Sequence, residues 1–289
     1  MIRLGTRASA LALAQARWVA ERLPDETELV TITTAGDRGS RDDKSRFVKE
    51  IEDALLAGEV DLAVHSAKDV PGRLPAGLSI AGVPERADPR DALCGAASLD
   101  ELGEGAVVGT ASVRRRAQLL ALRPDLDVRE LRGNVDTRLR RLAEGGLDAI
   151  VLARAGLVRL DRGDEGVALG EMVPAAGQGC LALEARADDS RTSAAAAEVT
   201  DRAALTTLTA ERALVTALEA TCNTPIGAHA WLDGDALRLT AFVGLPDGSH
   251  WIRDELPGAA GESAELGREV AGRLTSAGAR ELLAQAEGR

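Results

Sequence analysis

The sequence predicts an α/β protein built from two α/β units and a small α+β domain. In the first two units, short apolar runs typical of strands alternate with helical patterns, and the connections between them are short. This order indicates βαβ units with a largely parallel sheet in each. After Asp201 the order changes to a long helix, three successive strands and a last helix, which is typical of a small α+β domain.

The first unit shows the alternation from its first residues. Apolar runs at 2–5, 29–33 and 62–65 have the length of strands, and the last has the character of a buried strand. Helical patterns cover 11–23 and 47–56. Each helix therefore connects two strands, as a βαβ unit requires.

The second unit repeats this pattern and the third does not. Strands are expected at 107–109, 128–131 and 149–152, with helices at 113–122 and 135–142. In the third unit, helix 203–218 precedes strands at 228–232, 237–243 and 251–256 and helix 263–277. Segment 84–90 and a stretch at 177–179 read as crossing points, so we expect domain 1 at 1–86 and 179–199, domain 2 at 87–178 and domain 3 at 200–289.

Composition excludes several classes of function. The chain has 289 residues, a formal net charge of -11 and 2% aromatic residues. It therefore has neither a general attraction for polyanions nor the aromatic side chains that stack on bases. Its three cysteines are far apart and match no disulfide framework or metal-binding spacing. No apolar run is long enough to cross a membrane and no signal peptide is recognisable, so we expect a cytoplasmic protein without a metal site.

Polar residues follow the strand at 62–65, at the end where open parallel sheets bind ligands. His65, Ser66, Lys68 and Asp69 occupy this position, and Pro71 ends regular structure. A carboxylate there is suited to moving protons and stabilising a developing positive charge. The alternative is a structural turn, in which Asp69 caps backbone N–H groups and Lys68 is solvated.

The second unit carries a candidate anion site. Thr110 and Ser112 follow a strand and open a helix, whose N-terminus favours negative charge. Arginines follow at three successive strand–helix junctions: Arg114, Arg115, Arg116, Arg132, Arg138, Arg154 and Arg159. In a net acidic chain this concentration predicts a pocket for several carboxylates or phosphates. The alternative is a solvated helix face with ion pairs.

Cys222 lies in a polar loop between a helix and a strand. A loop thiol is more accessible than a buried one, so covalent chemistry is conceivable there. The alternative is an inert, partly buried cysteine. Cys94 and Cys180 belong to apolar runs, so we expect both to fill the core.

Eight segments carry a resemblance to a known family, in the same order along nearly the whole chain. They are GTRAS at 5–9, FVKE at 47–50, AVHSAKDVP at 63–71, DPRDA at 88–92, GTASVRR at 109–115, LRGNVDTR at 131–138, PAAGQG at 174–179 and the Cys222 loop ending in PIG at 225–227. Together they resemble the porphobilinogen deaminase (hydroxymethylbilane synthase) family of tetrapyrrole, porphyrin and haem biosynthesis.

The resemblance implies two domains like those of periplasmic binding proteins, with the site in the cleft between them, and a third domain that carries Cys222. It implies a transferase in which Cys222 forms a thioether to a dipyrromethane cofactor. Four porphobilinogen molecules are then joined head to tail, each losing ammonia, and hydrolysis releases hydroxymethylbilane. It also implies a cytoplasmic monomer without nucleic-acid or membrane partners.

The same resemblance implies roles for single residues. Asp69 matches the catalytic carboxylate, which stabilises the cation formed when ammonia leaves. Cofactor-binding positions are matched by Cys222, Lys68, Thr110, Ser112, Arg114, Arg115, Gln178 and Gly179. Substrate-binding positions are matched by Arg7, Ser9, Lys44, Phe47, Arg132, Arg138 and Arg159. Arginines suit this task because porphobilinogen carries an acetate and a propionate.

Two segments depart from the family pattern. Residues 34–46 form a shorter loop before Phe47, and Ala220-Thr221 precede Cys222 where glycine is frequent. The competing hypothesis is a two-lobed binding or sensor domain for a carboxylate ligand, since the first two units alone permit it. That hypothesis gives Cys222 no role. An inactive relative is a third possibility, and the presence of Asp69 and Cys222 argues against it.

Overall fold

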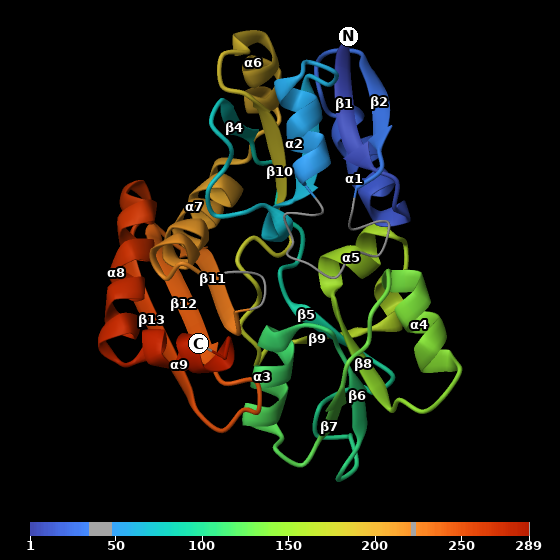
Figure 1. Ribbon diagram of the computed structural model, residues 1–289, viewed down its shortest axis with the longest axis vertical. Helices are drawn as coiled ribbons and strands as arrows, with labels where there is room; N and C mark the ends of the chain where they lie inside the picture. The colour runs from blue at the N-terminus through green and yellow to red at the C-terminus, as the bar shows by residue number, and fades with distance from the viewer. Residues whose placement is uncertain (35–47, 221–223, 289) are drawn as a thin grey trace.

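The computed structural model describes residues 1–34, 48–220 and 224–288. Their strands form three sheets, two of five strands and one of three. Each sheet and its helices form a separate unit, and the three units meet at the centre of the molecule (Figure 1). Among the described residues, no helix is both long enough and apolar enough to cross a membrane.

The first unit is built from two separate segments of the chain, one before and one after the second unit in the sequence. Its elements are β1 (Ile2–Arg7), α1 (Ala10–Ala20), β2 (Thr27–Ile32), α2 (Lys49–Leu56), β3 (Leu62–Ser66), η2 (Ala67–Asp69), β4 (Leu78–Gly82), β10 (Leu181–Arg186) and α6 (Ser190–Glu198). The sheet order is β2-β1-β3-β10-β4. Leu62 and Val64 point to the face covered by α1 and α6, whereas Ala63 points to the face covered by α2.

The second unit is formed by the part of the chain between these two segments. Its elements are β5 (Asp91–Cys94), β6 (Val107–Gly109), α3 (Val113–Leu122), β7 (Asp127–Arg129), α4 (Val135–Ala143), β8 (Ala149–Ala153), α5 (Arg154–Arg159), η3 (Gly163–Glu165) and β9 (Val167–Leu169). The sheet order is β7-β6-β8-β5-β9. Leu119 of α3 packs on one face, and Leu139 of α4 and Leu157 of α5 pack on the other.

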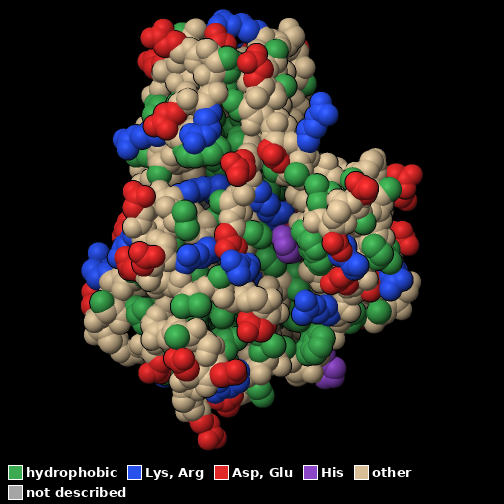
Figure 2. All heavy atoms as spheres, turned by 180° about the vertical axis from the view of Figure 1, so that it is seen from behind, with side chains coloured by type: hydrophobic (Ala, Val, Ile, Leu, Met, Phe, Trp, Pro, Cys, Tyr) green, Lys and Arg blue, Asp and Glu red, His purple; other side chains and the backbone are tan. Residues whose placement is uncertain are grey.

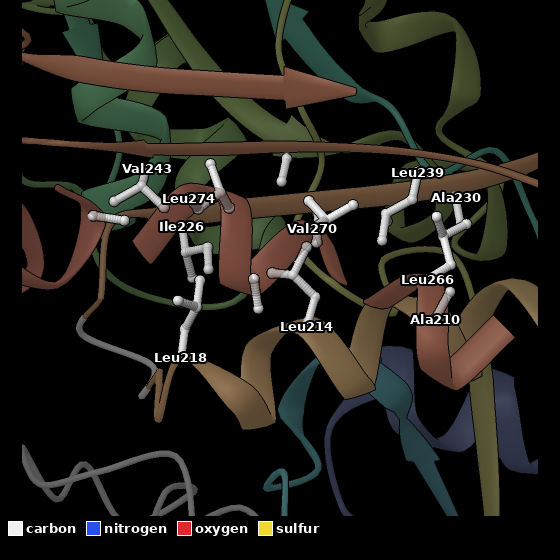
Figure 3. Packing of buried hydrophobic residues seen from close by; sticks show 14 of the residues in the cluster. Ala210, Leu214, Leu218, Ile226, Ala230, Leu239, Val243, Leu266, Val270 and Leu274 are labelled. Carbon is white, nitrogen blue, oxygen red and sulfur yellow. The ribbon is translucent and has the colours of Figure 1, made fainter. Parts of the chain in front are cut away.

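The third unit is a three-stranded antiparallel sheet with helices on one face. It comprises α7 (Arg202–Ala217), β11 (Ile226–Asp233), β12 (Ala236–Gly244), β13 (Trp251–Ala259), η4 (Ala260–Glu262), α8 (Ser263–Ser276) and α9 (Ala279–Ala286). In Figure 3, Leu214 of α7 and Val270 and Leu274 of α8 point toward the sheet. α7 lies between this core and the first unit (Figure 1).

The prediction of largely parallel sheets is confirmed, and each five-stranded sheet contains one strand of opposite direction, β10 in the first unit and β5 in the second. β10 runs antiparallel to β3 and β4, and β5 runs antiparallel to β8 and β9. Both β5 and β10 enter their sheets from a crossing segment rather than from a crossover helix, so nothing imposes the parallel direction. The sequence analysis missed several short elements: β4, β5, β9, α5 and α9.

The two crossing segments, 84–90 and 174–180, lie side by side. Ala87 N donates to the carbonyl of Gly179 over 3.2 Å. Gly179 has φ +90, and a Cβ there would lie 2.3 Å from the Ala87 oxygen, so only glycine fits. The connection between the first two units therefore consists of two tightly packed chain segments.

Candidate active site

The candidate catalytic turn follows β3 directly. Ala67 N donates to the carbonyl of Cys180 over 3.0 Å, and Val70 N closes the turn by donating to Ala67 O over 3.2 Å. Gly177 of the same crossing segment packs against the turn, where a Cβ would lie 3.0 Å from Lys68 N. The second crossing segment thus holds Lys68 and Asp69 at the carboxyl end of β3, and both are half-buried.

His65 does not belong to this turn, contrary to the sequence expectation. Its side chain is buried in the core, where Nε2 lies 2.9 Å from Oε2 of Glu184. The alternation along β3 explains the difference, because His65 shares the face of Ala63 and points toward α2. Ser66 has the opposite direction and accepts from Nε2 of Gln15 over 3.0 Å.

Arg114 and Arg115 are buried and share one carboxylate. Nη1 and Nη2 of Arg114 donate to Asp91 over 2.7 and 3.0 Å, and Nε of Arg115 donates to the same group over 2.9 Å. The two guanidinium groups and Gln178 keep the pKa of Asp91 well below its usual range, although burial acts in the other direction. Two cations for one anion leave excess positive charge at the start of α3.

Gln178 connects the catalytic turn to this arginine pair. Its Oε1 accepts from Nζ of Lys68 over 3.3 Å, while its Nε2 donates to Asp91 over 2.9 Å and to Pro89 O over 2.8 Å. Gln178 is 1% exposed, so these contacts are made in the interior. A path of hydrogen bonds therefore runs from Lys68 in the first unit, through Gln178 in the crossing segment, to Asp91 in the second unit.

The three predicted hydroxyl residues cap helices or turns. Ser9 is the N-cap of α1 and accepts from Ala12 N over 3.3 Å. Ser112 is the N-cap of α3 and accepts from Arg115 N over 3.4 Å, and Thr110 accepts from Ser112 N over 3.2 Å. Each oxygen is used as an acceptor, which leaves its O–H to donate to an anion.

Arg138 and Arg159 have no carboxylate partner among the described residues. Nε of Arg138 donates to Gly133 O over 2.8 Å, and Nη2 of Arg159 donates to Gly179 O over 2.7 Å. Burial lowers the pKa of each to about 10. Both side chains remain partly accessible to solvent. Partly accessible guanidinium groups that have no carboxylate partner among the described residues are suited to binding an anionic ligand.

The other predicted arginines fall into two groups. Arg132 is exposed and pairs with Glu130 over 2.7 Å, whereas Arg7 is half-buried at the end of β1. Arg116 and Arg154 donate to backbone carbonyl oxygens. Lys44, Phe47 and Cys222 lie outside the described residues. Figure 2 shows acidic and basic side chains interspersed over one face of the molecule.

Sequence reasoning missed two buried carboxylates that organise the site. Asp91 opens an apolar strand, which is the signal that a charged residue is held by partners in the interior. Glu211 is fully buried in α7, binds Arg86 of the first crossing segment over 2.7 Å and accepts from Gly177 N over 2.6 Å. No periodic pattern distinguishes it from an exposed helical glutamate.

Comparisons with known proteins cover nearly the whole chain. A family model described as "Porphobilinogen deaminase, dipyromethane cofactor binding domain" matches residues 2–194, and "Porphobilinogen deaminase, C-terminal domain" matches 205–276. The porphobilinogen deaminase of Thermus thermophilus is 51% identical, covering 98% of each chain. That of Deinococcus radiodurans is 46% identical, covering 98% of this chain and 97% of its own.

A comparison with solved structures finds weaker likenesses. An ABC transporter structure from Parabacteroides distasonis is 14% identical with a TM-score of 0.44, covering 68% of this chain and 69% of that one. A likeness at that level adds nothing to the sheets and helices described above.

Proposed function

This chain belongs to the porphobilinogen deaminase family, and we propose that it joins four porphobilinogen molecules head to tail on a covalently bound dipyrromethane, releasing hydroxymethylbilane and ammonia. One observation carries the assignment to this site. Lys68, next to Asp69, bonds to Gln178, and Arg159 bonds to the adjacent Gly179. A carboxylate and a set of cations are therefore held together at one crossing segment.

The described residues fit the dipyrromethane that the family model names. Two porphobilinogen units carry four carboxylates between them, and the start of α3 has two buried arginines for one aspartate. Arg114, Arg115, Thr110 and Ser112 would hold the cofactor carboxylates, and Lys68, Gln178 and Gly179 would be further cofactor-binding residues. When bound through Cys222, dipyrromethane supplies the pyrrole carbon to which substrate is joined.

Arginines with spare hydrogen-bond donors bind the incoming substrate. Arg138 and Arg159 each donate one hydrogen bond to a carbonyl oxygen, so the remaining N–H groups are available to an acetate or a propionate. The remaining substrate-binding residues in this proposal are Arg7, Ser9, Lys44, Phe47 and Arg132. Bidentate guanidinium–carboxylate contacts fix the orientation of the pyrrole, which lowers the entropic part of the barrier.

Asp69 acts on the charge that develops during the reaction. Positive charge appears on the pyrrole ring as ammonia leaves porphobilinogen. A carboxylate held in a rigid turn stabilises that charge without reorganising, and a carboxylate can also receive a proton from the pyrrole nitrogen. The turn supplies rigidity through Ala67 N, Val70 N and the packing of Gly177.

Intact-mass measurement tests the proposed cofactor. The purified chain is expected to carry a covalent increment equal to one dipyrromethane, because Cys222 is the proposed anchor. Cys222→Ala should lack the increment, and Cys94→Ala serves as the matched control because Cys94 is buried in the core. A wild-type chain that stays unmodified after incubation with porphobilinogen would exclude this function.

The role of Asp69 is tested by Asp69→Asn. The amide keeps the shape of the side chain but loses the charge that stabilises the cation, so turnover should fall roughly a hundred-fold or more. Ammonia release and product formation are measured on protein that still carries the dipyrromethane increment. Near-normal turnover would remove Asp69 from the mechanism.

The remaining parts of the proposal concern the molecule as a whole. The transferase is of the hydroxymethylbilane synthase type and acts as a cytoplasmic monomer. Domains at 1–86 with 179–199, 87–178 and 200–289 each contain all the strands of one sheet, which supports this division. Light scattering at assay concentration tests the monomer, and a dimeric mass would contradict it.

A further inference from the structure

Helix α7 touches the chain immediately after the catalytic turn. Nη1 of Arg212 donates to Val70 O over 3.2 Å, and Nη2 donates to Pro71 O over 2.7 Å and to Gly72 O over 3.3 Å. One guanidinium group therefore binds three successive carbonyl oxygens. Pro71 has no N–H, so this segment depends on contacts from outside it for its conformation.

Two further contacts hold the same segment against α7. Ala204 and Leu208 of the helix pack on Ala67 and Val70 in one apolar cluster. One turn beyond Arg212, Thr216 is so close to Gly72 that a Cβ at position 72 would lie 2.8 Å from its Oγ1. The catalytic turn is thus seated on α7 along several helical turns.

The same helix leads to the proposed cofactor anchor. α7 ends at Ala217, five residues before Cys222. Its other buried charge, Glu211, is fixed to the crossing segments by Arg86 and Gly177 N. A helix is a stiff element, and Arg212 lies ten positions before Cys222 in the sequence. In the sequence, α7 therefore lies just before the proposed anchor, and in the structure it contacts the turn that carries Asp69.

We propose that Arg212 is a positioning residue, which holds the Asp69 turn in place against helix α7. This inference rests on the proposed function, because it takes the role of Asp69 from it. Arg212 touches neither substrate nor cofactor in this proposal. Its loss leaves binding intact and misplaces the carboxylate, and small misplacements of a catalytic group reduce rate strongly.

The principal test compares Arg212→Met with Arg202→Met. Arg202 lies on the same helix and is exposed, so its replacement controls for the loss of one arginine. Arg212→Met should lower kcat at least roughly ten-fold, with KM for porphobilinogen within about two-fold and the dipyrromethane increment retained. Arg212→Lys, which keeps the charge but not the fork, should fall between Arg212→Met and wild type.

A second pair of variants probes the same contact without touching Arg212. Gly72→Ala should push the turn away from Thr216 and lower kcat. Thr216→Ala in the same chain removes the Oγ1 atom, which lies 2.8 Å from the new Cβ, and leaves the next nearest atom at 3.7 Å. The double variant should therefore recover the wild-type kcat. If Arg212→Met does not fold, this rescue decides the question.

Several results would overturn the proposal. For Arg212→Met, they are a kcat within two-fold of that of Arg202→Met, a raised KM with unchanged kcat, or a missing cofactor increment. For Gly72→Ala, the contradicting result is a wild-type kcat. Failure of the proposed function is distinct, because it would show as a wild-type chain without the increment or without turnover.

Discussion

At the scale of single residues, the partners of each arginine distinguish its role. Arg114 and Arg115 are buried with Asp91, whereas Arg138 and Arg159 bond only to carbonyl oxygens among the described residues. The residue pattern alone predicted all four as one anion site, and only the family resemblance separated the first two, as cofactor-binding, from the last two, as substrate-binding. Cys94 and Cys180 are buried as predicted, and burial raises the pKa of their thiols to about 11 and about 12.

Arg138→Leu tests the substrate role of an arginine without a carboxylate partner. We expect KM for porphobilinogen to rise roughly ten-fold, because a charge-assisted hydrogen bond is lost. The melting temperature should not fall, since no carboxylate among the described residues offsets the burial of this cation. Arg140→Leu is the control, because Arg140 is exposed on the same helix. Equal kinetics for the two variants would remove Arg138 from the site.

At the scale of elements, a buried acidic cluster joins α2, β3 and β10. Glu52 lies with His65 and Glu184 in the interior, and all three side chains are below 7% exposed. Burial and the charge of Glu184 raise the pKa of Glu52 from its ordinary value of 4.5 to about 6, while His65 opposes the shift. Asp53 and Lys49 act on it more weakly and in opposite directions.

Glu52→Gln tests this cluster through the pH dependence of stability. A raised carboxyl pKa means that the folded state holds the proton more tightly, so wild type loses stability as pH rises from about 4.5 to about 6. The amide side chain of the variant does not titrate, so the variant does not lose stability in this way. Glu52→Gln should gain roughly 1–2 kcal/mol over wild type between pH 4.5 and pH 7. A difference that is constant with pH, measured by denaturant unfolding, would contradict the assignment.

Elements were predictable where the local pattern is long. The helices expected at 113–122, 135–142 and 203–218 match α3, α4 and α7 closely. α5 has six residues and β5 four, which is too short for a periodic signal. The direction of β5 and β10 is set by the sheets that they enter, so no local pattern contains it.

At the scale of the whole molecule, Glu211 joins three parts of the chain. Its carboxylate binds Arg86 between the first two units, accepts from Gly177 N and accepts from Ala230 N of the third unit over 2.7 Å. The charge of Arg86 and contacts with His229 lower its pKa, although burial opposes this. One side chain in α7 therefore couples the third unit to the passage between the other two.

Glu211→Ala should lower the melting temperature by about 5–10 °C. Removing one partner of a buried ion pair costs about 3–5 kcal/mol, because Arg86 is left as an unpaired buried charge. Glu255→Ala is the control, since Glu255 pairs with Arg238 at the surface. A shift no larger than that of the control, measured by calorimetry, would show that the contact does not join the units.

The sequence by itself determined the family, the alternation of two α/β units with an α+β domain, and the residue types from which the proposed site is built. These depend on local patterns and on motifs that stand in order along one chain. Only the tertiary structure decided that His65 faces the core, that Asp91 neutralises one of two arginines, and that Arg212 supports the turn of Asp69. The reason is physical: the partner of a buried charge is set by packing between elements far apart in sequence, and no local pattern records it.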